Sequence, residues 1–221
     1  MPRGTIVAIG GFAEVGPLLD YVLGLARGKR VLYVPTAGME NADYTVSWYG
    51  VLEDHGATMS HLHFFPWLPA DARERVLTAD VVLVPGGNTA NMLAIWRLHG
   101  FDAILREAWE AGVVLAGWSA GAICWFEAGV TDSFGPQLAG MECLGFLGGS
   151  ACPHYDGEAA RRARYAELIR DGFPPGLAID DDVGVRFDGT ELAEVVTKRE
   201  GATAYQVRAD GEEPLEARLL A

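Results

Sequence analysis

The chain has 221 residues, half of them hydrophobic, which is enough to bury the core of one sizeable α/β domain. Its formal net charge of −13 argues against nucleic acids and membranes as partners, because both are bound through basic surfaces. The three cysteines, Cys124, Cys143 and Cys152, have no spacing typical of a disulfide framework or a zinc site, so we expect no structural metal.

Short apolar runs alternate with segments of helical periodicity through the first two-thirds of the chain. The runs predict five buried strands, at 5–11, 30–36, 59–65, 81–87 and 113–119. Helices are predicted at 14–27, 40–53, 69–80, 88–98 and 101–111. This alternation predicts an α/β fold, in which a mostly parallel sheet is covered by helices on both faces.

The final third of the chain has a different pattern. One further helix is predicted at 157–170. The segments after it alternate polar and apolar residues and are punctuated by Asp-Gly turns; they cover 176–189, 191–198, 202–210 and 214–220. This pattern predicts antiparallel strands added to an edge of the sheet. Because no linker or repeat interrupts the chain, we expect a single domain over residues 1–221.

The N-terminal stretch MPRGTIVAIGGF has the form of a first strand rather than of a signal peptide, which would need a longer apolar region. No run approaches the roughly 18 apolar residues of a membrane span. The expected location is therefore the cytoplasm.

The segment AGWSAGA (116–122) carries the pattern G-x-S-x-G around Ser119. Between a strand and a helix, this pattern is typical of a nucleophile elbow, where a sharp turn exposes a serine at a helix N-terminus. The competing interpretation is a tight turn without chemistry, because small residues are common in such turns.

A serine nucleophile needs a base, and His154 is the only histidine that follows Ser119 in the chain. The base needs a carboxylate to orient it, and two candidates compete: Asp181, at the end of an apolar run, and Asp156, two residues after the histidine. The chain order excludes an α/β-hydrolase, in which the histidine comes last.

An acyl-transfer reaction also needs backbone N–H groups to bind an oxyanion. We expect these from Ala120, which follows the serine, and from Gly87, in the loop after the fourth predicted strand. Asn88, in the same loop, is expected to contact the substrate. Because neither a P-loop nor G-x-G-x-x-G is present, no nucleotide cofactor is expected.

Four segments occur in an order that resembles the peptidase E and cyanophycinase family of serine peptidases: VPGGNTANML (84–93), AGWSAGAICWF (116–126), PHYDG (153–157) and GLAIDDDVGV (176–185). The resemblance implies a flavodoxin-like fold similar to class I glutamine amidotransferases. It implies a triad of Ser119, His154 and Asp181, the last in place of the family's glutamate. The amidotransferase pattern His-x-Glu would instead nominate Asp156.

The resemblance also implies short peptide substrates, among them dipeptides with an N-terminal aspartate. A basic residue would bind that carboxylate, and Arg161 and Arg164 share a helix face that could reach the site, whereas Arg162 points elsewhere. The alternative for each arginine is a solvated helix face. The sequence leaves the oligomeric state open, with a homodimer as one option.

Two other functions stay open at this point. One is a binding protein of the same fold without catalysis, and the other is a cyanophycinase-like hydrolase. A cysteine-dependent enzyme is less favoured, because Cys124 falls inside the helix predicted after the elbow.

Overall fold

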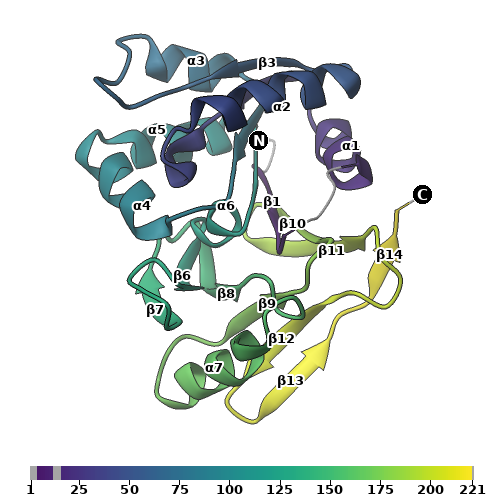
Figure 1. Cartoon of the computed structure of the whole chain (residues 1–221). Coiled ribbons are helices and arrows are strands. Elements are labelled where there is room, and N and C mark those ends of the chain that lie inside the picture. Colours follow the sequence, from purple (N-terminus) through teal and green to yellow (C-terminus); the bar gives the residue numbers. More distant parts are fainter. Residues whose placement is uncertain (1–3, 12–15, 221) are drawn as a thin grey trace.

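This computed structural model describes residues 4–11 and 16–220, which form two β-sheets with helices packed against them (Figure 1). The larger sheet has eight strands in the order β14-β11-β10-β1-β5-β4-β2-β3. Five of them are parallel: β1 (Thr5–Ile9), β5 (Val114–Trp118), β4 (Val81–Val84), β2 (Arg30–Tyr33) and β3 (Thr58–His61). The edge beyond β1 is extended by β10 (Val183–Asp188), β11 (Glu191–Thr197) and β14 (Ala217–Leu219).

Both faces of the central strands β1, β5 and β4 are buried, as expected for parallel strands that are continuously apolar. In β1, Ile6 and Ala8 face one core while Val7 and Ile9 face the other. Residues of α1 (Gly16–Leu25) and α2 (Ala42–Asp54) cover the second face. The first face is covered by α3 (Ala72–Thr78), α4 (Thr89–Leu98), α5 (Phe101–Glu110) and the short α6 (Ala120–Ile123). A 3₁₀ turn, η1 (Pro35–Gly38), follows β2.

The smaller sheet has six strands in the order β13-β12-β9-β8-β6-β7. Its parallel centre consists of β6 (Phe126–Thr131), β8 (Leu147–Cys152) and β9 (Gly176–Ile179). Antiparallel strands flank it: β7 (Ala139–Glu142), β12 (Ala204–Arg208) and β13 (Gly211–Pro214). The helix α7 (Ala159–Arg170) packs on this sheet through Tyr165 and Ile169, on the far side of the molecule from α2 and α3 (Figure 1).

The α/β fold class is confirmed, but the prediction that all C-terminal strands extend one sheet is wrong. Only β10, β11 and β14 do so, while β9, β12 and β13 complete the second sheet. The sequence pattern did not predict the second sheet, because its strand β8 is LGGSAC, which is rich in small residues and has no β-branched side chain. Its neighbour β9 packs so closely that a Cβ on Gly176 would lie 1.9 Å from the carbonyl oxygen of Ser150.

The ends of the predicted helices shift by a few residues. The helix predicted at 69–80 begins at Ala72, and the one predicted at 157–170 begins at Ala159. The first two residues of the helix predicted at 14–27 lie outside the described residues. Within the described part of the chain, no helix is long and apolar enough to cross a bilayer.

Candidate active site

The turn between β5 and α6 holds Ser119 in a backbone conformation that few residues adopt. Ser119 has φ 55° and ψ −114°. A non-glycine residue at positive φ costs roughly 1–3 kcal/mol and persists only where the surrounding structure imposes it. The carbonyl of Ser119 accepts hydrogen bonds from the N–H groups of Ala122 and Ile123, at 3.0 and 3.1 Å, so α6 starts directly after the turn. This strand–turn–helix geometry is typical of a nucleophile elbow.

The two glycines of the motif let the elbow pack tightly. A Cβ on Gly117 would lie 2.4 Å from the carbonyl oxygen of Val84, and one on Gly121 would lie 2.1 Å from the same oxygen. The strand before the serine and the helix after it therefore both approach β4 more closely than any side chain allows. Close packing thus imposes the strained turn that exposes Ser119.

His154 and Asp181 form a hydrogen-bonded pair at the ends of two strands of the smaller sheet. His154 follows β8, Asp181 follows β9, and the distance from His154 Nδ1 to Asp181 Oδ1 is 2.7 Å. A carboxylate only accepts, so the neutral ring donates from Nδ1 and leaves Nε2 as an acceptor. The side chains are 24% and 32% exposed, which leaves the ring accessible from a cleft.

Asp156, the other candidate acid, contacts the backbone of Asp181 instead of the histidine. Its Oδ1 accepts the N–H of Asp181 at 2.8 Å, and its Oδ2 accepts a bond from Arg199. Arg199 also donates to the carbonyl oxygen of Asp181 at 3.0 Å. Burial raises the pKa of Asp156, but the bonds from Asp181 and Arg199 outweigh it and lower the pKa below its ordinary value. An ionised Asp156 and Arg199 therefore fix the peptide groups on both sides of Asp181.

The Ser119 cleft, of about 360 Å³, brings most of the predicted site residues together. Its lining consists of Gly87, Asn88, Ser119, Asp132, Ser133, His154, Glu158 and Arg161. The strand order explains this arrangement, because β5 lies between β1 and β4 and parallel strands end at the same edge of a sheet. Gly11, after β1, abuts the acid–base pair: a Cβ there would lie 2.3 Å from Asp181 Oδ1 and 2.4 Å from His154 Cε1.

The loop after β4 approaches Ser119 from the other side. A Cβ on Gly86 would lie 3.1 Å from Ser119 Cβ. Gly87 has φ 140°, and a Cβ there would lie 2.1 Å from the carbonyl oxygen of Ala37, so only glycine fits. Ala120 is the first residue of α6, where N–H groups lack helical acceptors. The residues predicted to bind an oxyanion thus flank the serine.

The predicted substrate-binding residues differ in their placement. Asn88 lines the cleft and caps α4, accepting the N–H of Asn91 at 2.8 Å and donating to the carbonyl of Ser133 at 3.0 Å. Arg161 also lines the cleft, but it is buried and donates to both carboxylate oxygens of Glu158, at 2.7 and 3.2 Å.

Two other arginines of α7, Arg162 and Arg164, do not line the cleft. Arg164 donates to the carbonyl of Leu138 at 3.0 Å and to Glu167 at 2.7 Å, and it does not line the cleft. The structure therefore separates Arg164 from the other predicted site residues. Arg162 points elsewhere, as expected: its guanidinium carbon lies 4.7 Å from the ring centroid of Tyr155, and its side chain is half-exposed.

Sequence reasoning missed Gly11, Asp132, Ser133 and Glu158. Gly11 could have been predicted from the sequence, because a pair of glycines directly follows the first apolar run, just as Gly86 and Gly87 follow the fourth. Asp132 and Ser133 follow β6, a strand of the sheet that was not predicted. Nothing in the sequence placed that strand end beside Ser119.

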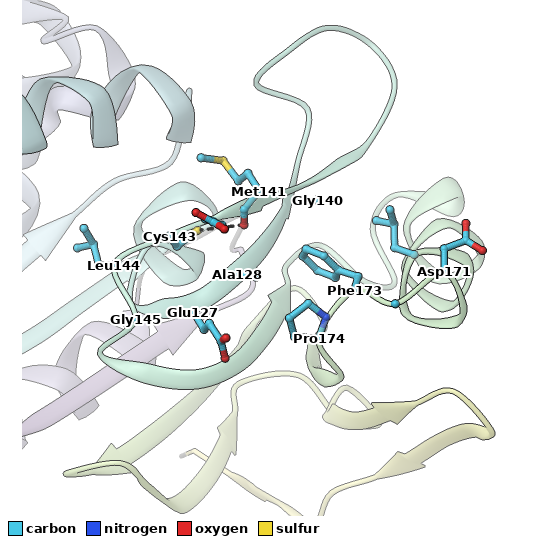
Figure 2. A pocket seen from close by; sticks show the side chains of 13 residues that line it. Glu127, Ala128, Gly140, Met141, Cys143, Leu144, Gly145, Asp171, Phe173 and Pro174 are labelled. Atoms are coloured by element: carbon cyan, nitrogen blue, oxygen red, sulfur yellow. Dashed lines mark hydrogen bonds between the residues drawn. The ribbon is translucent and has the colours of Figure 1, made fainter.

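A larger cavity, of about 690 Å³, shares no residue with the Ser119 cleft. It lies between the β6–β7 hairpin and the C-terminal end of α7; Figure 2 shows Met141 and Cys143 on one side and Phe173 and Pro174 on the other. Burial raises the pKa of the Cys143 thiol to about 12, so it stays protonated at neutral pH.

Cys124 is fully buried in the core, where burial raises its pKa well above the ordinary value. Among the described residues, no group of three His, Cys, Asp or Glu side chains is arranged to hold a metal ion.

Comparison with known proteins gives consistent matches. Residues 5–195 match the family model of Peptidase family S51. The chain is 45% identical over 191 residues to the uncharacterized peptidase YgaJ of Bacillus subtilis (strain 168), covering 85% of this chain and 83% of the relative. It is 32% identical over 108 residues to Peptidase E of Haemophilus influenzae, an alignment that spans 48% of each chain.

A solved structure shares the fold. The crystal structure of a peptidase from an acI-B1 Actinobacterium superposes with a TM-score of 0.69, covering 97% of this chain and 95% of the other. The two sequences are 20% identical, so this likeness concerns the fold alone.

Proposed function

The chain belongs to peptidase family S51 and is a serine-type peptidase, and on this premise we propose that Ser119, His154 and Asp181 form its catalytic triad. The observation that carries the proposal is the 2.7 Å bond between His154 and Asp181 beside a serine in a strained elbow. Nothing in packing alone requires a hydroxyl at this strained position, which faces a cleft together with the histidine. The arrangement therefore favours catalysis over a binding protein that lacks it.

The proposed reaction follows from the roles of the three side chains. His154 Nε2 accepts the proton of the Ser119 hydroxyl as the oxygen attacks the scissile carbonyl, while Asp181 holds the ring in orientation and stabilises the charged imidazolium. The N–H groups of Gly87 and Ala120 bind the oxyanion. His154 then protonates the leaving amine, and a water molecule cleaves the acyl-enzyme by the same steps in the second half of the reaction.

The size of the Ser119 cleft favours short peptides. Its volume of about 360 Å³ lies at the lower end of the roughly 300–1,000 Å³ that is usual for small-molecule sites. A dipeptide fits such a volume, whereas a polymer would need a longer groove, so we favour short peptides over a cyanophycinase-like substrate.

An N-terminal aspartate stays a prediction of the resemblance. Arg161 is the residue of the cleft that would bind the carboxylate of such an aspartate. The guanidinium of Arg161, however, already donates to both carboxylate oxygens of Glu158. Binding an aspartate would require Arg161 to exchange one carboxylate for another, which gives little net gain.

The test is hydrolysis of a panel of dipeptides by the wild type and by Ser119→Ala, with Ser47→Ala as the matched control on the exposed face of α2. We expect Ser119→Ala to lose roughly 10⁴-fold or more in kcat, with an unchanged melting temperature, because only a hydroxyl is removed. The control should keep wild-type rates. Near-wild-type turnover by Ser119→Ala would overturn the proposed triad.

A further inference from the structure

A second pocket adjoins the Ser119 cleft and shares Asn88 with it. This apolar pocket has a volume of about 340 Å³. The apolar side chains that line it come from η1 and the residue after it, from the loop after β3 and from α4; they are Ala37, Met39, Phe65, Ala94 and Ile95.

Two large side chains of the apolar pocket are held exposed on a fixed backbone. Met39 is 85% exposed and Phe65 is 65% exposed. Met39 and Glu40 both have positive φ values, 58° and 53°. Glu40 accepts the N–H groups of Phe64 and Phe65, at 2.5 and 3.3 Å, which ties the two loops together. Strained backbone that presents apolar side chains to solvent is typical of a binding site.

The strand order places the apolar pocket on the opposite side of Ser119 from His154. In the order β10-β1-β5-β4-β2, Ser119 follows the middle strand. The histidine side is marked by Gly11, after β1, which abuts His154. On the other side, Gly86 contacts Ser119, and the next residue, Gly87, contacts Ala37, which lines the apolar pocket.

This placement assigns the pocket to one part of the substrate. In the proposed reaction, His154 hands its proton to the leaving amine, so the leaving group lies on the His154 side. The residue that supplies the scissile carbonyl then extends toward the apolar pocket. Of the residues that line the pocket, Glu40 alone carries a charge, and both of its oxygens are bonded to backbone N–H groups.

We propose that the apolar pocket binds the side chain of the residue that supplies the scissile carbonyl, and that this side chain is large and apolar, as in leucine, methionine or phenylalanine. The inference rests on the proposed function, since it needs Ser119 as the nucleophile. It favours an uncharged side chain over aspartate, because the pocket offers an acidic side chain no cationic partner.

The experiment measures kcat/KM for the dipeptides Gly-Ala, Ala-Ala, Leu-Ala, Phe-Ala and Asp-Ala. We expect Leu-Ala and Phe-Ala to exceed Ala-Ala and Asp-Ala by about 10-fold or more, because a pocket discriminates on this scale between side chains that differ by a few methylenes. Phe65→Ala should lower the values for Leu-Ala and Phe-Ala by about 10-fold and leave Ala-Ala within about 2-fold.

Two further variants keep the test sharp. Ala94→Trp, on the exposed face of α4, should fill the pocket and reduce Leu-Ala and Phe-Ala more than Ala-Ala. Trp67→Ala is the matched control, because Trp67 is 74% exposed in the same loop as Phe65 but does not line the pocket. It should leave all five substrates unchanged.

A preference for Asp-Ala, or equal losses on all five substrates in Phe65→Ala, would overturn the pocket assignment. Covalent labelling of Ser119 by a fluorophosphonate distinguishes a wrong pocket assignment from a wrong triad. If Ser119 is labelled but the wild type hydrolyses none of the five dipeptides, the pocket assignment alone is wrong. If Ser119 is neither labelled nor required, both proposals are wrong.

Discussion

At the scale of single residues, the partners of Asp181 decide which carboxylate orients the histidine. The sequence left Asp181 and Asp156 as alternatives, because both lie close to His154 or to a strand end. Spacing along the chain does not give the direction of a side chain. The structure shows Asp181 bonded to the imidazole and Asp156 bonded to the backbone of Asp181.

These roles predict unequal effects of two conservative substitutions. Asp181→Asn should lower kcat by about 10⁴-fold, because an amide can donate to Nδ1 and favour the wrong tautomer. Asp156→Asn should lower kcat by only about 10-fold, since its side-chain oxygen still accepts the N–H of Asp181 while the ionic bond to Arg199 is lost. Steady-state kinetics with both variants check this. A larger loss in Asp156→Asn than in Asp181→Asn would reverse the assignment.

The neighbouring Asp180 predicts a pH-dependent change in stability. It is buried, its Oδ2 accepts the N–H of Thr203 at 3.1 Å, and its Oδ1 has no hydrogen-bond partner among the described residues. Burial raises its pKa above the ordinary 3.8, so the folded state holds this proton more tightly than the unfolded state. The stability that Asp180 contributes is therefore complete below pH 3.8 and is lost as the pH rises through the folded pKa.

Asp180→Asn keeps the acceptor for Thr203 and removes the buried charge. We expect the variant to be more stable than the wild type at pH 7 by about 1 kcal/mol, or about 2–4 °C in Tm for a chain of this size. The advantage should shrink as the pH falls toward 4. Thermal unfolding of both proteins between pH 4 and pH 7 measures it, and a difference that does not change with pH would contradict the explanation.

At the scale of elements, three strand ends of the larger sheet, those of β1, β4 and β5, form one side of the candidate site. The strand-to-helix turn after β5 was predictable, because its glycines, its serine and the apolar runs around it are contiguous in the sequence. The loop after β1 was not predicted to take part. Its role depends on contact with residues about 140 and 170 positions further along the chain, which local patterns do not show.

The loop after β1 gives a prediction at this scale. Gly11→Ala would place a Cβ 2.3 Å from Asp181 Oδ1 and 2.4 Å from His154 Cε1, so the acid–base pair must move. We expect kcat to fall by about 100-fold, because displacements of about 1 Å in a catalytic pair have effects of this size. Gly50→Ala is the control: it lies within α2 with open space around its Cβ position, so activity should be unchanged. Equal activity in the two variants would contradict the contact at Gly11.

At the scale of the whole molecule, the sequence predicted the larger sheet much better than the smaller one. Four of its five parallel strands, β1, β2, β4 and β5, are short runs of mostly apolar residues, and alternation along the chain reveals such runs. The smaller sheet joins β6–β8 with strands from the C-terminal third, and its central strands contain many small residues. Cross-strand contact decides such pairing, so the cleft residues that follow β6, Asp132 and Ser133, could not be foreseen.

The two sheets together carry the proposed triad, since Ser119 follows a strand of the larger sheet while His154 and Asp181 follow strands of the smaller one. The central claim is that this arrangement makes Ser119 a nucleophile activated by His154. The most direct measurement is peptide mapping by mass spectrometry after reaction of the folded protein with a fluorophosphonate. We predict one adduct on Ser119 in the wild type, none in Ser119→Ala, and labelling slower by about 100-fold or more in His154→Ala. An adduct on another serine of the cleft, such as Ser133, with Ser119 unmodified, would contradict the account.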